Sequence, residues 1–406
     1  MNPAERRLIG YTAAAHAMVH VLELTYPALL TRIEDDFGIR AVISGALATV
    51  FGWAFGSSAI PAGFLVDRLG SRRVLVYTFA GAAAMAVLVG LSPNEWVLAA
   101  GLAGLGLSIG LYHPAGLSLI AQAVNQRGLA LGFHGVAGNV GQALAPAIAV
   151  ALAVAIDWRA PFFFLAAVAA VLALAMATTR LPIRGEAEVL VLTESAPERQ
   201  RAQGRGSNHL MAPLLVVYAA FVLSGTVYRG VITFLPEHLE DFVNEDLGGA
   251  FVTVALLAGA LGQLLGGALS QRVKLERLAP AIGLLAVPAM ILTAILSGAP
   301  LVVLASVFVF LYFANQPVFN GLIADYAPEG AVGRSYGLSF FANFGLGSMG
   351  GIIAGAFVQR WDTRAAFLAL SAFLAVTVAL SVLLWIMAER RRSRSTLPEK
   401  AAEGLP

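Results

Sequence analysis

The sequence predicts an all-α integral membrane protein, with twelve transmembrane helices arranged as two pseudo-symmetric six-helix bundles. Of its 406 residues, 58% are hydrophobic and 12% are charged, and the mean hydropathy is +0.79. Soluble domains carry roughly 25% charged residues. Uncharged runs such as 41–66, 160–179 and 367–388 each reach the length of about 20 apolar residues that crosses a bilayer. This composition disfavours a soluble enzyme, a nucleic-acid binder and a disordered chain.

Twelve apolar runs fit transmembrane helices, and they are too long and continuous for β-barrel strands, which alternate over about ten residues. The first six runs are 9–33, 42–66, 74–92, 95–124, 128–156 and 158–179. The second six are 212–238, 247–270, 278–297, 300–324, 333–358 and 363–388. We predict bundles over 1–182 and 212–389, a cytoplasmic linker over 183–211 and a basic cytoplasmic tail over 390–406.

The basic residues predict the orientation, because cytoplasmic loops carry an excess of Lys and Arg. With the N-terminus inside, 20 of the 26 Lys and Arg residues fall on the cytoplasmic side and 5 outside, while Arg229 lies within a span. Both termini are therefore predicted to be cytoplasmic, in a bacterial inner membrane. The first apolar segment has no small-residue cleavage site, so we expect a span there and not a signal peptide.

The two halves resemble each other at a constant offset. Asn139-Val140-Gly141 corresponds to Asn343-Phe344-Gly345 at an offset of 204, and residues 63–68 correspond to 267–272 at the same offset. Such a repeat is typical of transporters whose two halves enclose a substrate near the middle of the membrane.

Residues 63–75, Gly-Phe-Leu-Val-Asp-Arg-Leu-Gly-Ser-Arg-Arg-Val-Leu, resemble the signature loop of the major facilitator superfamily between its second and third spans. In that family the loop Asp approaches the start of span eleven, where the helix dipole is positive, and closes the inner gate. The resemblance implies this role for Asp67. The gating loop that it implies consists of Gly63, Asp67, Arg68, Gly70 and Arg72.

Within that superfamily, the chain most resembles the fosmidomycin-resistance-type exporters, which are inner-membrane drug/proton antiporters. The resemblance is carried by Tyr26-Pro27, Tyr112-His113-Pro114, residues 136–141 with Pro146, and Gly333-Arg334. It implies a packing set in span five that consists of Gly138, Asn139, Gly141 and Pro146. The chain departs from the pattern at His16, Ala115 and His134, where that family has Asp, Glu and Phe.

Two spans carry ionisable residues near the middle of the membrane, where insertion of a charge costs at least about 2.5–3.5 kcal/mol. His16, His20 and Glu23 share one narrow stripe of the helix over 9–33. Tyr228 and Arg229 lie near the centre of 212–238. The resemblance places both spans at the cavity, so Glu23 would face Arg229 across the two halves. This pair either binds substrate charge or a proton, or serves as a structural ion pair.

The membrane histidines suggest proton coupling, because histidine titrates near neutral pH. Besides His16 and His20 in span one, the membrane spans contain His113 and His134. A hydrogen bond between helices is the alternative role for each of these two. His16, His20 and Glu23 also have the spacing of a divalent metal site, so a metal remains open as an alternative cargo. We expect no resident metal or cofactor.

Span ten, over 300–324, offers uncharged donors and acceptors that suit a polar ligand or, equally, contacts between helices. These residues are Asn315, Gln316 and Asn320. The acidic segment 237–246 is predicted to be a solvated outer loop. The chain has no cysteine and no Walker sequence, which excludes thiol catalysis and an ATP-driven pump.

The sequence therefore predicts a secondary transporter, not an enzyme, that exports a small organic compound or drug in exchange for protons. Two alternatives stay open: proton-coupled uptake of a small organic anion, and export of a divalent metal or metal complex. The expected partners are the substrate, protons and the lipid bilayer, with no nucleic acid, and the chain is expected to be a monomer.

Overall fold

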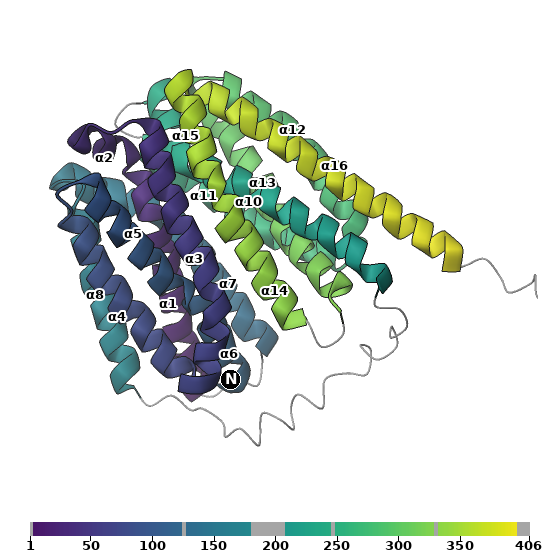
Figure 1. Cartoon of the computed structure of the whole chain (residues 1–406), viewed down its shortest axis with the longest axis horizontal. Coiled ribbons are helices and arrows are strands. Elements are labelled where there is room, and N and C mark those ends of the chain that lie inside the picture. Colours follow the sequence, from purple (N-terminus) through teal and green to yellow (C-terminus); the bar gives the residue numbers. More distant parts are fainter. Residues whose placement is uncertain (1–2, 124–126, 180–207, 245–247, 329–331, 396–406) are drawn as a thin grey trace, which may run out of the picture.

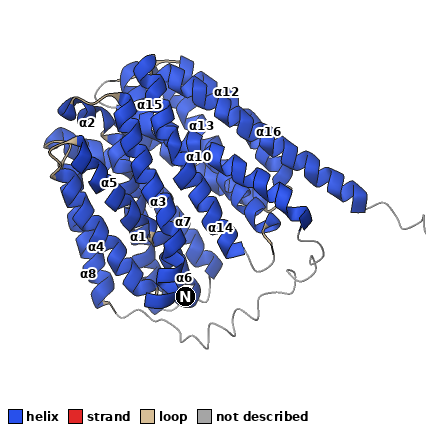
Figure 2. Cartoon of the chain, viewed as in Figure 1, coloured by secondary structure: helices blue, strands red, loops and turns tan. Residues whose placement is uncertain are grey.

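The computed structural model describes residues 3–123, 127–179, 208–244, 248–328 and 332–395. Within these ranges the chain is helical apart from short turns, and it contains no strand (Figure 2). Eleven helical segments of the described chain are long and apolar enough to cross a membrane. The predicted all-α membrane class is confirmed.

The first half of the chain consists of α1 (Pro3–Ala28), α2 (Leu30–Phe37), α3 (Ala41–Leu69), α4 (Ser71–Gly90), α5 (Glu95–Gly110), α6 (Tyr112–Ala123), α7 (Arg127–Ala155) and α8 (Ala160–Thr178). The second half consists of α10 (Asn208–Phe242), α11 (Gly248–Ser270), α12 (Leu275–Ile295), α13 (Gly298–Tyr326), α14 (Val332–Phe340), the wide turn η2 (Phe341–Gly345), the tight turn η3 (Leu346–Met349), α15 (Gly350–Arg360) and α16 (Thr363–Ser395).

The first expected span, 9–33, is the one that is not among the eleven apolar segments of the described chain. Its hydropathy is lowered by His16, His20 and Glu23, all of which are buried. The chain also breaks at Leu29 into α1 and the short α2. With 26 residues, α1 is about 39 Å long at 1.5 Å per residue, which exceeds the hydrocarbon thickness of about 30 Å.

The helix pairings of the first half recur in the second (Figure 1). In the first half α1 packs on α7, α3 on α5, and α4 on α8. In the second half α10 packs on η3 and α15, α11 on α13, and α12 on α16. These pairings correspond at the repeat offset of the sequence, so the repeated pattern reflects repeated packing.

The two halves meet along a seam in which α3 packs against η2 and α15, with a second contact between α7 and α11. Glycines allow backbone to approach backbone in this seam. A Cβ on Gly45 would lie 2.2 Å from the carbonyl oxygen of Gly351, and one on Gly56 would lie 2.2 Å from the amide nitrogen of Gly345. The Thr49 hydroxyl donates to the carbonyl oxygen of Ser348 at 2.9 Å. In Figure 1, α3 and α15 run side by side, whereas α3 and α14 diverge toward the C-terminal end of α3.

A smaller contact between the halves joins α2 to α10, at the end of the bundle where α3 begins. Glu34 on α2 accepts a hydrogen bond from the Ser44 hydroxyl. Burial raises the pKa of the Glu34 carboxyl to about 7, and the negative charges of Asp35 and Glu240 add to this rise against the opposing effect of Ser44. This contact is therefore expected to weaken when Glu34 ionises.

We expect Glu34→Gln to remove a pH dependence of stability. The folded carboxyl holds its proton more tightly than the unfolded one, so its stabilising effect is complete below about pH 4.5 and is lost as the pH rises through about 7. The loss amounts to at most about 3 kcal/mol. Thermal unfolding of the purified protein between pH 5 and 8 measures it. The exposed Asp157→Asn variant is the control, because its side-chain oxygen can still accept from the backbone N–H of Arg159 and Ala160, and it should keep the wild-type slope. An equal slope in Glu34→Gln would contradict the assignment.

Candidate functional site

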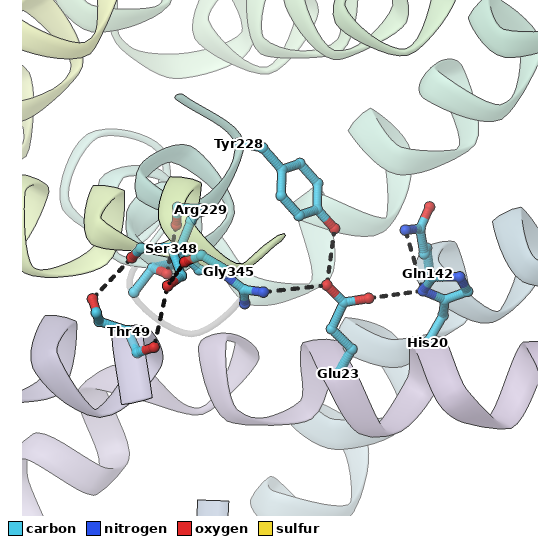
Figure 3. A network of polar contacts seen from close by, with 9 residues as sticks. His20, Glu23, Thr49, Gln142, Tyr228, Arg229, Gly345 and Ser348 are labelled. Carbon is cyan, nitrogen blue, oxygen red and sulfur yellow. Dashed lines mark hydrogen bonds and ion pairs between the residues drawn. The ribbon is translucent and has the colours of Figure 1, made fainter. Parts of the chain in front are cut away.

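A network of polar side chains joins the two halves at the centre of the bundle (Figure 3). Glu23 on α1 and Arg229 on α10 form the central pair, with 3.5 Å between the Arg229 Nη2 and the Glu23 Oε1. The Tyr228 hydroxyl donates to the same oxygen at 3.4 Å. Glu23 is 1% exposed and Arg229 is 2% exposed, so neither charge is shared with solvent. The predicted juxtaposition of these residues is what the structure shows.

The carboxylate of Glu23 has a closer partner on its own helix. The Nδ1 of His20 lies 2.7 Å from the Glu23 Oε2. Arg229 is held less tightly, because its Nε has no hydrogen-bond partner in the described part of the chain. Its guanidinium carbon lies 5.5 Å from the centre of the Phe51 ring on α3, so the side chain extends from α10 into the first half.

Four histidines gather beside the central pair, and we call them the histidine cluster: His16, His20, His113 and His134. The rings of His16 and His134 stack with their centres 4.0 Å apart. The Nδ1 of His16 donates to the carbonyl oxygen of His134 at 2.7 Å, and the Nε2 atoms of His16 and His20 are 3.1 Å apart. Gly138 makes room for this arrangement, since a Cβ there would lie 2.4 Å from the His16 ring.

A cavity of about 680 Å³, counting its open mouth, adjoins this network on the side of the second half. Its walls come from α10, α12, α13, η2 and α16, and Gln142 on α7 is the lining residue from the first half. The polar lining consists of Gln142, Ser224, Tyr228, Tyr312, Asn315, Gln316, Asn343 and Thr377. None of the lining side chains is Lys, Arg, Asp, Glu or His. Tyr228 belongs to both the cavity and the network, and the Gln142 amide nitrogen lies 3.4 Å from the Nδ1 of His20.

The structure divides the residues that the sequence assigns to one cavity. Asn315, Gln316 and Tyr228 line the cavity. Asn320 is exposed, and its carbonyl oxygen accepts a hydrogen bond from Tyr336. The residues of the central pair and of the histidine cluster are not among those that line the cavity.

The residues of the predicted packing set in span five lie on α7. Gly138 and Gly141 face α1, and a Cβ on Gly141 would lie 2.2 Å from the carbonyl oxygen of Ala17. Pro146 is buried and Asn139 is partly buried. This is the same close helix approach that the glycines of the seam allow.

The predicted gating loop is only partly described. Gly70 ends α3 with a φ of +78°, a left-handed backbone that favours glycine. Arg72 donates to the carbonyl oxygens of Met176 and Ala177 at 2.8 and 2.6 Å, which ties the start of α4 to the end of α8. Arg68 is exposed and Gly63 has open space around it. The side chain of Asp67 lies outside the described residues.

Residues 237–242 of the acidic segment are not the solvated loop that the sequence suggests, and Glu245 and Asp246 lie outside the described residues. Helix α10 continues to Phe242, and His238 is 0% exposed. The Nδ1 of His238 lies 2.8 Å from the Thr363 hydroxyl, and its Nε2 donates to the carbonyl oxygen of Thr293 at 2.9 Å. His238 therefore links α10 to α12 and α16. The sequence between 236 and 242 is compatible with a continued helix, but its high charge favoured the prediction of a solvated loop.

The comparisons with known proteins agree with this architecture. The sequence model described as the Major Facilitator Superfamily matches residues 13–351. A "Probable L-galactonate transporter" of Escherichia coli (strain K12) is 26% identical over 58% of this chain and 54% of its own length. A "Probable sulfoacetate transporter" of Cupriavidus necator is 22% identical over 66% of this chain and 65% of its own length. The chain thus spans less than two thirds of either relative.

One solved structure shows the same fold. A bacterial homologue of the human lysosomal transporter Spinster, in an inward-facing and occupied conformation, superposes with a TM-score of 0.79 over 95% of this chain and 98% of its own. At 17% sequence identity this likeness concerns the arrangement of the helices. Neither of the two relatives named above is named for the fosmidomycin-resistance type.

Proposed function

Because this chain belongs to the Major Facilitator Superfamily, we propose that it is a secondary active transporter that exports a small organic compound in exchange for protons. The observation that carries this proposal is the position of the central pair. Glu23 and Arg229 come from different halves and meet beside a cavity. A rocking motion of the halves changes this contact, so a solute that displaces Tyr228 from Glu23 acts on the contact that joins them.

The lining of the cavity favours a polar, uncharged group on the substrate. Amide and hydroxyl groups of Gln316, Ser224 and Tyr312 offer both donors and acceptors, and the Phe319 ring offers an apolar face. A small hydroxylated compound with an apolar side matches these walls. The hydroxyl groups of L-galactonate, for which one relative is named, fit this substrate class, whereas its carboxylate has no charged partner in the cavity lining.

A second candidate is proton-coupled uptake of a small organic anion. The two relatives are named for anions, L-galactonate and sulfoacetate, and the unpaired Nε of Arg229 offers a donor for a carboxylate once the halves part. The direction of transport separates the two candidates. The finer resemblance to fosmidomycin-resistance-type exporters stays a prediction, as do the bacterial inner membrane and the cytoplasmic termini.

Reconstitution into proteoliposomes tests the proposal. A panel of labelled compounds, with galactonate, sulfoacetate and fosmidomycin among them, is measured with and without an imposed pH gradient. We expect one class of compound to accumulate in the vesicle lumen when the lumen is the more acidic side, because exchange moves the substrate against the flow of protons. A protonophore should abolish this accumulation. Flux that only equilibrates the compound, unchanged by the gradient, would overturn proton coupling. Accumulation in the lumen when the outside is the more acidic side would select the uptake candidate, because the substrate then moves together with the protons.

We expect Asn315→Ala to raise the KM about tenfold and leave kcat nearly unchanged. Asn315 lines the cavity, its side-chain nitrogen donates to the carbonyl oxygen of Ala279, and its Oδ1 has no partner in the described chain. One hydrogen bond to substrate is worth about 1 kcal/mol or somewhat more. Initial rates over a range of substrate concentrations measure the effect. Ser306→Ala, on the same helix but away from the cavity, is the matched control, and an equal KM in both variants would contradict the role.

A further inference from the structure

The geometry points to a binding site for a divalent transition-metal cation, formed by the Nε2 atoms of His16, His20 and His113. This site lies in the first half of the chain, and it stands independently of the substrate and coupling ion proposed above. One ring-nitrogen atom of each of the three residues lies within 4.8 Å of the other two. His16 and His20 come from successive turns of α1, and His113 comes from the start of α6.

The spacing of the first two nitrogens fits a shared metal ion. The Nε2 atoms of His16 and His20 are 3.1 Å apart. Bonds of about 2.0–2.1 Å from a tetrahedral Zn²⁺ to two imidazoles place the nitrogens roughly 3.4 Å apart. The centre of the third ring, that of His113, lies 5.2 Å from the His16 ring and 5.6 Å from the His20 ring. Small side-chain movements therefore bring three nitrogens to bonding distance of one ion.

The hydrogen bonds of the Nδ1 atoms show why those two Nε2 atoms need a cation between them. A carbonyl oxygen only accepts, so the Nδ1 of His16 carries the proton that it donates to His134. The Nδ1 of His20 likewise donates to the Glu23 carboxylate. A neutral imidazole has one N–H, so both Nε2 atoms present lone pairs. Two lone pairs that face each other at 3.1 Å repel unless a positive charge lies between them.

The same hydrogen bonds match the surroundings that metal-bound histidines have in proteins. Such residues donate their second ring N–H to a carboxylate or a backbone carbonyl, which fixes the ring and makes the other nitrogen a better ligand. His20 has the carboxylate of Glu23 in this position, and His16 has the carbonyl oxygen of His134. Glu23, which the sequence suggests as a third ligand, is therefore better placed to orient His20 than to bind the ion.

His113 supplies a second, independent observation. Its Nε2 is buried and has no hydrogen-bond partner among the described residues. A buried polar atom without a partner costs roughly 1–3 kcal/mol, so such atoms usually mark a missing ligand. The ring packs against Phe55 and Phe340, which holds it toward the other two histidines.

Three neutral imidazoles select a particular class of ion. They favour Zn²⁺, Co²⁺, Ni²⁺ or Cu²⁺ over Mg²⁺ and Ca²⁺, which prefer oxygen ligands. Three protein ligands leave a tetrahedral ion one position for water or for a donor atom of a bound solute. His134 has a different role, since it stacks on His16 and offers its backbone oxygen.

Metal binding to the purified full-length protein, freed of chelatable metal and of any purification tag, tests the site. We expect one Zn²⁺ per chain by equilibrium dialysis, and Co²⁺ should give the intense visible absorption of a tetrahedral complex. His113→Phe, which keeps an aromatic ring against Phe55, should lose at least a hundredfold in affinity. Glu23→Gln should lose about tenfold to a hundredfold, as removal of an orienting carboxylate does elsewhere.

His134→Phe is the matched control, because it keeps the stacked ring and the backbone carbonyl and should bind the ion as the wild type does. Equal binding by wild type and His113→Phe, or no saturable binding by wild type, would overturn the site and leave a shared proton between His16 and His20. If His113→Phe does not fold, the wild type alone decides: Zn²⁺ but not Mg²⁺ should raise its unfolding temperature, and the absence of this difference rejects the proposal.

Discussion

Transport is expected to be lost when Arg229 is replaced by Ala, and the protein should also be less stable. The change leaves Glu23 buried at 1% exposure with one ion-pair partner fewer. Breaking a buried ion pair costs about 3–5 kcal/mol when the remaining charge has no other partner, and we expect a smaller cost here because Glu23 keeps its contact with the Nδ1 of His20 at 2.7 Å. Uptake or efflux in proteoliposomes measures the first effect, and thermal unfolding in detergent measures the second.

The double variant Glu23→Gln with Arg229→Ala separates pairing from independent roles. Removing both charges removes the uncompensated one, so the double variant should be more stable than either single variant. Arg277→Ala is the control, since its ion pair with Glu389 is at the surface, with side chains 50% and 37% exposed, and exposed pairs contribute about 0–1 kcal/mol. Additive losses in the double variant would show that Glu23 and Arg229 do not act as a pair.

The second large effect is expected in the seam between the halves. In Gly45→Ala, the new Cβ would lie 2.2 Å from the carbonyl oxygen of Gly351 and 2.9 Å from its carbonyl carbon. Both neighbours are backbone atoms, so no side chain can rotate away, and α3 and α15 must move apart. We expect transport to fall at least tenfold, because the protein can no longer reach the conformation in which α3 and α15 are in contact at Gly45 and Gly351.

The chain has no native cysteine, so two introduced cysteines can carry spin labels without interference. Labels at the exposed positions Arg40 and Trp361 flank the end of the seam and should report a longer distance in Gly45→Ala. Gly267→Ala on α11 is the matched control, because nothing lies within 4 Å of its new Cβ. An unchanged label distance in Gly45→Ala, together with full transport, would contradict the prediction that close contact between α3 and α15 is needed for transport.

Most of the fold could be predicted because eleven of the twelve expected spans are apolar enough for hydropathy to report them directly. The interruptions were harder to predict. The break at Leu29 and the change of winding at η2 and η3 depend on what packs against the helix. Helix ends likewise depend on tertiary contacts, as the extension of α10 to Phe242 shows.

The candidate site was predictable where it carries charge. Glu23 and Arg229 stand out because a charge in an apolar run needs a reason, and the family resemblance placed their helices opposite each other. Gln142, Tyr312 and Asn343 carry no charge, so their place at the cavity follows only from the rotation of each helix. The close contact of His20 with Glu23 depends on side-chain rotamers, which spacing along α1 does not determine.

The separation of the uncharged cavity in the second half from the titratable cluster in the first half has an evolutionary consequence. On the proposal that the cavity binds the substrate, substitutions among its residues on α13 and α16 are expected to alter which solutes fit without touching the charges on α1. On the proposed coupling to protons, changes near Glu23 on α1 are expected to alter how transport is driven without reshaping most of the cavity walls. Related proteins of this design are therefore expected to diverge in substrate range faster than in energetics, and exchange of one half between them should transfer one property and keep the other.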